Sequence, residues 1–191
     1  VYDGRRGLVR HVMARKAFAT GEILCAIITT DGKFDCAAEL AQELAKRIPA
    51  VKSVSRIIND TKTPLWMGGD EYVLYGKGYI TDELCGCRFE VSAKSFYQIN
   101  PIQTEKLYNT AIEMAEITEN SRIVDAYCGI GTVGIIAAKK KNCTLVGFDI
   151  SEDSVKNAEA NAKLNGIERA EFLCAADNSY VLKKDKTPDV L

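Results

Sequence analysis

The sequence predicts an α/β fold in which a doubly wound parallel sheet, incomplete at its C-terminal end, follows a small α+β domain. Short apolar segments at residues 122–126, 144–149 and 170–174 alternate with helical patterns, as strand–helix–strand units do in parallel sheets. A glycine-rich turn follows the first of these segments directly, as it does at nucleotide sites. Residues before about 90 instead predict short strands with short connections, which favours antiparallel pairing.

The small α+β domain is expected to span residues 1–90. Its predicted strands are 8–13, 22–29, 51–59, 74–81 and 87–92, separated by glycine-containing or polar turns. Residues 35–48 carry an apolar stripe at helical spacing, and Pro49 ends that helix.

The second domain is expected to span residues 91–191. Its predicted helices cover 104–117, 133–141 and the residues between Ser151 and Gly166. Ser151 is a favourable N-cap, and Asn165-Gly166 is a common helix end. Residues 187–191 have the pattern of a turn that leads into another strand, so we expect the chain to be a fragment of a longer protein.

Composition excludes several classes of protein. The net charge of −1 gives no electrostatic signature of nucleic-acid binding, and no apolar run approaches the length of a membrane-spanning helix. The seven cysteines are an odd number and lie mostly in apolar segments, as reduced thiols of cytoplasmic proteins do. Cys85 and Cys87 form the one close pair, so we expect neither a metal site nor an iron–sulfur cluster.

The most informative stretch is Asp125-Ala-Tyr-Cys-Gly-Ile-Gly-Thr132. Gly129 and Gly131 lack a Cβ, so the backbone can approach a ligand closely. Asp149 closes the next predicted strand, where its carboxylate can accept hydrogen bonds from both hydroxyls of a ribose. This arrangement predicts a nucleotide site at the carboxyl ends of the strands.

The acid before the turn indicates which nucleotide fits. Gly129, Gly131 and Gly134 formally match the dinucleotide fingerprint. Asp125, however, would repel a phosphate and suits a cationic ligand, such as the ammonium and sulfonium of S-adenosyl-L-methionine. The Gly-Lys-Ser/Thr of a Walker loop is missing, which excludes that type of phosphate-binding loop. Because of Asp125, we favour a methyl donor over a dinucleotide.

A second motif, Ser95-Phe-Tyr-Gln-Ile-Asn-Pro101, joins the two domains. One interpretation is structural: a strand ends, Asn100 caps a helix and Pro101 occupies its first turn. The other is functional: Phe96 stacks on a base, and Gln98 binds the methyl donor or a base edge.

Together the two motifs resemble the S-adenosylmethionine-dependent RNA 5-methyluridine methyltransferases, of the type that modifies 23S ribosomal RNA. The resemblance covers nearly the whole chain. It implies a class I, Rossmann-like methyltransferase fold, an RNA partner with ribosomal RNA expected first, and transfer of a methyl group to C5 of a uridine.

The resemblance also assigns residues. The donor site is implied at Gln98, Asp125, Tyr127, Gly129, Gly131, Thr132, Asp149 and Asp177, with Asn178 as the alternative to the last. Phe96 is the implied base contact. The family's nucleophilic cysteine and carboxylate base are expected beyond Leu191, so no catalytic residue is assigned here and the chain alone is expected to be inactive. Cys128 is expected to belong to the donor turn and not to be the nucleophile.

Two alternatives stay open. The same fold serves methyltransferases that act on proteins or small molecules. A non-catalytic RNA-binding module at residues 1–90, followed by a vestigial nucleotide domain, also agrees with the sequence.

Overall fold

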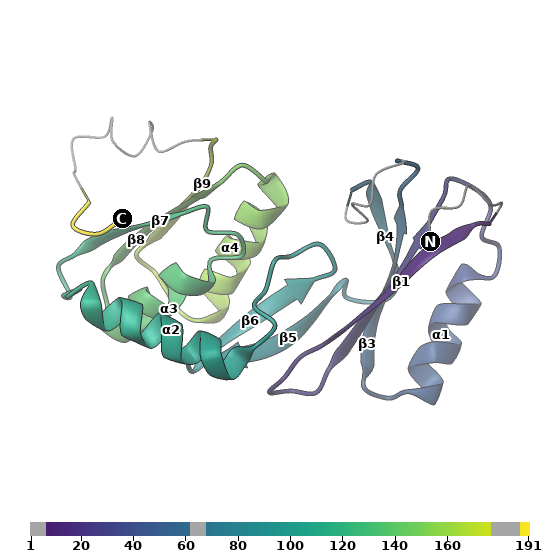
Figure 1. The fold of residues 1–191 in the computed structure, drawn as a ribbon, viewed down its shortest axis with the longest axis horizontal. Helices are drawn as coiled ribbons and strands as arrows, with labels where there is room; N and C mark the ends of the chain where they lie inside the picture. Colours follow the sequence, from purple (N-terminus) through teal and green to yellow (C-terminus); the bar gives the residue numbers. More distant parts are fainter. Residues whose placement is uncertain (1–6, 62–67, 177–187) are drawn as a thin grey trace. The chain divides into compact units, whose positions relative to one another are not determined.

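A computed structural model describes residues 7–61, 68–176 and 188–191 and divides the chain into two compact units (Figure 1). The first unit extends to Thr81 and includes Ser92–Lys94, and the second contains Asp82–Val91 and Ser95–Leu191.

The first unit is built on a mixed four-stranded sheet of order β1-β2-β3-β4. Its strands are β1 (Val9–Lys16), β2 (Ile23–Thr29), β3 (Val51–Ile58) and β4 (Asp70–Gly76). The outer two pairs are antiparallel and the central β2–β3 pair is parallel. Helix α1 (Ala37–Arg47) makes the crossover between the parallel strands, and its Ala41 packs in a buried cluster with Ile27, Val51 and Val54.

The predicted strand at 74–81 is wrong. Strand β4 ends at Gly76, and β5 (Tyr79–Leu84) begins after a turn. Gly76 and Gly78 both have positive φ, of 79° and 85°. A Cβ at Gly76 would lie 1.9 Å from the Lys52 carbonyl oxygen, so only glycine lets the chain turn here.

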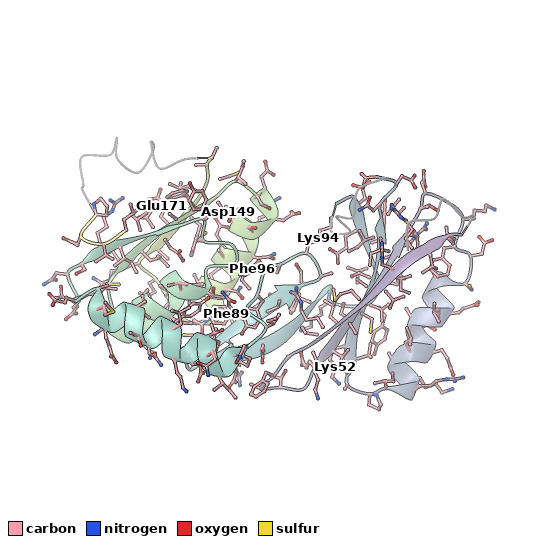
Figure 2. The ribbon with its side chains drawn as sticks, viewed as in Figure 1. Lys52, Phe89, Lys94, Phe96, Asp149 and Glu171 are labelled. Carbon is pink, nitrogen blue, oxygen red and sulfur yellow. The ribbon has the colours of Figure 1, made fainter. Side chains whose placement is uncertain are left out.

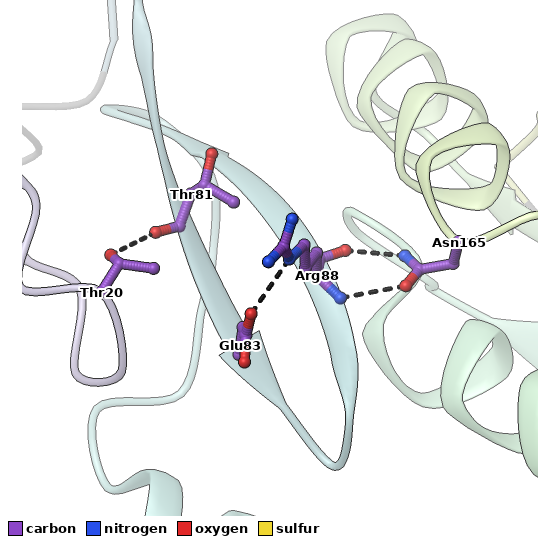
Figure 3. A network of polar contacts seen from close by, with 5 residues as sticks. All are labelled: Thr20, Thr81, Glu83, Arg88 and Asn165. Atoms are coloured by element: carbon purple, nitrogen blue, oxygen red, sulfur yellow. Dashed lines mark hydrogen bonds and ion pairs between the residues drawn. The ribbon is translucent and has the colours of Figure 1, made fainter.

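Strands β5 and β6 (Cys87–Ser92) form a hairpin closed by Cys85 and Gly86. Both turn residues have positive φ, 51° and 76°, as a type I′ turn requires. At the start of the hairpin, the Thr81 carbonyl accepts a hydrogen bond from Thr20 Oγ1 at 2.6 Å within the first unit (Figure 3). Residues 82–91 belong to the second unit, whereas the sequence placed the domain boundary near residue 90.

The second unit contains the parallel sheet β7-β8-β9, with strands at the predicted bounds. These strands are β7 (Arg122–Ala126), β8 (Thr144–Asp149) and β9 (Ala170–Cys174). Val124, Val146 and Phe148 form a buried cluster on them. On the other edge of β7, Val190 forms a parallel bridge with Ile123.

Three helices accompany this sheet: α2 (Pro101–Met114), α3 (Thr132–Lys141) and α4 (Glu152–Leu164). Helix α3 packs on β7 and β8, and α4 packs on β8 and β9 (Figure 1). The predicted caps of two helices are confirmed: Asn100 Oδ1 accepts from the Gln103 amide at 3.2 Å, and Ser151 Oγ accepts from the Ser154 amide at 3.3 Å. No helix in the described part of the chain combines the length and apolar character needed to cross a membrane.

Candidate cofactor site

The turn between β7 and α3 has an unusual backbone. Tyr127, Gly129 and Gly131 all have positive φ, of 58°, 55° and 81°. At Gly131 an added Cβ would lie 2.8 Å from Ile135 Cδ1, so this side of the turn is packed. At Gly129 an added Cβ would meet no atom within 4 Å. The turn therefore has a packed side and an open side, and a ligand could approach the backbone from the open one.

Asp125 is the penultimate residue of β7 and caps the helix that follows the turn. Its Oδ2 accepts a hydrogen bond from the Gly134 amide at 2.9 Å, which satisfies one of the unpaired amides at the N-terminus of α3. A carboxylate thus already occupies the place where a dinucleotide phosphate would bind. This arrangement supports the preference for a cationic ligand.

Burial raises the pKa of Asp125 to about 6, the Gly134 hydrogen bond opposes this shift, and the negative charge of Asp149 adds to it. The ionised carboxylate is therefore poorly solvated. A cation bound nearby would stabilise it, as the methyl-donor hypothesis requires.

Asp149 ends β8 and holds the turn from the neighbouring strand. Its Oδ2 accepts from the Gly129 amide and its Oδ1 from the Ser151 amide, both at 2.9 Å. Each carboxylate oxygen can accept a further hydrogen bond, so the side chain keeps capacity for two ligand hydroxyls. Figure 2 shows Asp149 at the end of β8 and Phe96 on the segment between β6 and α2.

Exposed apolar side chains lie beside the two carboxylates. Tyr127 follows β7 and is 75% exposed, and Ile150 follows β8 and is 72% exposed. The ring of Tyr127 meets Phe148 edge-on, with 5.8 Å between centroids. Apolar surface next to carboxylates fits a ligand that combines a planar ring, hydroxyls and a positive charge. Sequence reasoning missed Ile150, although an apolar residue directly after a strand-ending acid is a readable signal.

The structure brings most of the predicted residues together. Those on the turn and the adjoining strand ends are Asp125, Tyr127, Gly129, Gly131, Thr132 and Asp149. Gln98 is half-buried and Phe96 is 75% exposed, both on the segment before α2. Asp177 and Asn178 lie outside the described residues. The roles of all these residues toward a ligand stay predictions.

Cys128 lies within the turn but is poorly suited to nucleophilic chemistry. The residue is buried. Burial, followed by the charges of Asp125 and Asp149, raises the pKa of its thiol to about 12. The reactive thiolate is therefore strongly disfavoured. Across residues 7–61, 68–176 and 188–191, no group of three or more His, Cys, Asp and Glu side chains is arranged to hold a metal ion.

Comparisons with known proteins show similarity to methyltransferases. Residues 117–189 match the family model described as a methyltransferase domain. The chain is 41% identical over 175 residues to an uncharacterized RNA methyltransferase of Caldanaerobacter subterraneus, a match that covers 91% of this chain and 38% of the relative. An uncharacterized RNA methyltransferase of Enterococcus faecalis is 40% identical over 166 residues, covering 87% of this chain and 36% of the relative.

A solved structure is also similar. The tRNA (uracil-54, C5)-methyltransferase of Pyrococcus abyssi, in complex with S-adenosyl-L-homocysteine, has a TM-score of 0.73 and 27% sequence identity. The match covers 91% of this chain and 41% of that one.

The fold and the family match together define the class of the second unit: it carries a class I methyltransferase fold with a Rossmann-like parallel sheet, as predicted. The predicted resemblance to RNA methyltransferases is also confirmed, because the curated relatives carry that name. The chain spans about two fifths of the length of these relatives.

Proposed function

We propose that this chain is the donor-binding part of an RNA methyltransferase that transfers a methyl group from S-adenosyl-L-methionine to C5 of a uridine. The observation that carries the proposal is a pair of carboxylates, Asp125 near the end of β7 and Asp149 at the end of β8, that both bind backbone amides of a glycine turn with an open side. Two further findings support it: the curated relatives are named RNA methyltransferases, and the similar Pyrococcus enzyme is a uracil-C5 methyltransferase.

Each side chain has a proposed task. The donor supplies an electrophilic methyl group on a sulfonium. Ionised Asp125 stabilises the positive charge, and Asp149 accepts hydrogen bonds from the ribose hydroxyls. Tyr127 and Thr132 border the donor, Gln98 hydrogen-bonds it, and Asp177 contacts the adenine.

Methylation at uracil C5 needs a nucleophile, because C5 by itself is weakly reactive. Addition of a cysteine thiolate to C6 would activate it, and a carboxylate base would later remove the C5 proton. The high pKa of the Cys128 thiol argues against its use as that nucleophile. Following the resemblance to the RNA 5-methyluridine methyltransferases, we assign the nucleophile and base to sequence beyond Leu191 and expect the chain alone to bind the donor without transferring a methyl group.

The acceptor is proposed to be RNA, with ribosomal RNA preferred, and Phe96 is proposed to stack on a base. Its ring is 75% exposed and thus available for stacking. A cytoplasmic location is proposed as well, supported by the free cysteines of the described residues.

Calorimetry with S-adenosyl-L-homocysteine tests donor binding. We expect the chain to bind one equivalent and Asp149→Asn to weaken binding about tenfold or more, because charge-assisted hydrogen bonds are lost. Asp153→Asn, an exposed acid in the first turn of α4, is the matched control and should bind like the wild type. Failure of both the chain and the longer natural protein to bind would contradict the proposal.

Methyl transfer identifies the acceptor. The natural protein in which this chain occurs should incorporate label from the donor into ribosomal RNA, and nuclease digestion should release 5-methyluridine. Labelled protein or small molecules with unlabelled RNA would favour the alternative substrate classes. A biological activity that survives Asp149→Ala unchanged would favour the non-catalytic RNA-binding module.

A further inference from the structure

Two asparagines hold the edge of strand β6: Asn161 in helix α4 and Asn165 at the C-cap of that helix. Asn165 Oδ1 accepts from the Arg88 amide at 2.9 Å, and its Nδ2 donates to the Arg88 carbonyl at 2.7 Å (Figure 3). One turn earlier, Asn161 Oδ1 accepts from the Glu90 amide at 2.7 Å, and its Nδ2 donates to the Glu90 carbonyl at 3.4 Å. The side-chain amides thus take the place of a neighbouring strand along this edge.

The geometry of helix and strand explains why two asparagines four residues apart can hydrogen-bond to one strand. Four residues of an α-helix rise about 6 Å, and two residues of a strand advance about 6.6 Å. Asn161 and Asn165 can therefore face Glu90 and Arg88 at the same time. Both asparagines are buried, at 0% and 8% exposure. Burial of either side-chain amide without these hydrogen-bond partners would cost free energy.

Asn161 makes one contact that Asn165 does not. Its Nδ2 also donates to the carbonyl of Ile130 at 3.1 Å. Ile130 lies between Gly129 and Gly131 and is itself 2% exposed. An asparagine amide has two N–H groups, and both have a partner here. The side chain therefore links β6 to the glycine turn through a fully satisfied, buried group.

We propose that Asn161 is a positioning residue for the donor site, which ties the glycine turn to the β5–β6 hairpin and thereby sets donor affinity. This inference rests on the proposed function. Alternate residues of the turn, Tyr127, Gly129 and Gly131, have positive φ, and the Asn161 bond ties the carbonyl of the intervening Ile130 to a residue outside the turn. Loss of the Asn161 bond would free the Ile130 carbonyl and loosen the open side of the turn where the ligand binds.

A matched pair of variants separates positioning from general stability. Asn161→Asp keeps the acceptor for the Glu90 amide and replaces the donor to the Ile130 carbonyl with an oxygen. Asn165→Asp makes the same change toward Arg88 and also removes the donor to the Asn161 backbone carbonyl, but it keeps the Asn161 bond to the glycine turn. Both should lower the thermal midpoint. Only Asn161→Asp should weaken S-adenosyl-L-homocysteine binding, by about tenfold, whereas Asn165→Asp should change it by no more than about twofold.

Equal affinities for the two variants, or wild-type affinity in Asn161→Asp, would overturn the inference. Native-state hydrogen exchange on the wild-type chain gives a test that needs neither a folded variant nor a ligand. The Glu90 and Gly131 amides should open with the same free energy and denaturant dependence. An opening of Gly131 that leaves Glu90 protected would overturn the link. A wild-type chain that binds no ligand would contradict the proposed function. The exchange result alone would then show whether Asn161 couples β6 to the glycine turn.

Discussion

Asp125 and Asp149 show how a single carboxylate can serve the fold and the ligand together. Asp125 pairs with the Gly134 amide, and Asp149 pairs with the Gly129 and Ser151 amides. These bonds hold a turn in which Tyr127 adopts a positive φ of 58°, a conformation that few residues other than glycine take. Both acids could be predicted from the sequence because each directly follows an apolar run. Their backbone partners could not, since the amides are positioned by the turn itself.

Asp125 should make stability depend on pH. Its pKa is raised to about 6, chiefly by burial, above the usual value of about 4. Between pH 4 and 6 the Asp125 carboxyl is therefore more protonated in the folded state than in the unfolded state. Its contribution to the free energy of unfolding should fall as pH rises through this range. Asp125→Asn keeps an acceptor for Gly134 and removes this effect. Its stability relative to wild type should increase from pH 4 to 6, by at most about 3 kcal/mol, and then level off.

Urea unfolding at several pH values measures this difference. Asp153→Asn, which removes an exposed acid near the start of α4, controls for the loss of one negative charge. A stability difference between Asp125→Asn and wild type that stays constant from pH 4 to 7 would contradict the assigned pKa.

Helices and strands could be predicted from the sequence where the hydrophobic pattern alone determines their bounds. The strand at 144–149 is almost continuously apolar, and its observed bounds match the prediction. The interval 74–81 was misread because β4 is largely exposed, so burial gives its sequence no clear alternation. Asn161 was also missed, since its role depends on a strand about 70 residues earlier in the chain. A polar residue on the buried, alanine-rich face of a helix was the available signal.

Gly134 should be required for the packing of α3 on its sheet. A Cβ there would lie 2.6 Å from Leu145 Cδ1 and 2.8 Å from Asp125 Oδ2. Gly134→Ala gains up to about 1 kcal/mol of helix propensity but forces a shift in a packed region, which typically costs about 1 to 3 kcal/mol. We expect a net loss of stability and weaker donor binding, because the Asp125 carboxylate must move.

Thermal unfolding and calorimetry of Gly134→Ala measure the two effects. Gly7→Ala is the control, since an added Cβ there would meet only the Val9 carbonyl oxygen, at 3.9 Å. A Gly134→Ala chain as stable as the control would show that α3 can move away from the sheet at little cost.

At the scale of the whole molecule, the sequence predicted both folds but placed their boundary differently from the structure. The sequence predicts short strands up to about residue 90 and an alternation of helices and strands after residue 100. The structure assigns residues 82–91 to the second unit, where α4 asparagines hold β6. That assignment depends on which distant segments lie close together in space, and local composition does not encode this.

Thiol labelling across a urea series tests which unit the hairpin unfolds with. Cys25 reports on the first unit and Cys128 on the second, and Cys87 reports on the hairpin. Cys87 and Cys128 are buried and Cys25 is half-buried. Burial raises the pKa of all three thiols, so opening should speed the reaction of each with a maleimide. Exposed Cys36 should label at once and serves as the control. We expect Cys87 to become reactive with the same free energy as Cys128, as mass spectrometry of the labelled peptides would show. If Cys87 instead opens together with Cys25, the hairpin unfolds with the first unit, and the asparagine contacts of α4 contribute little to holding it.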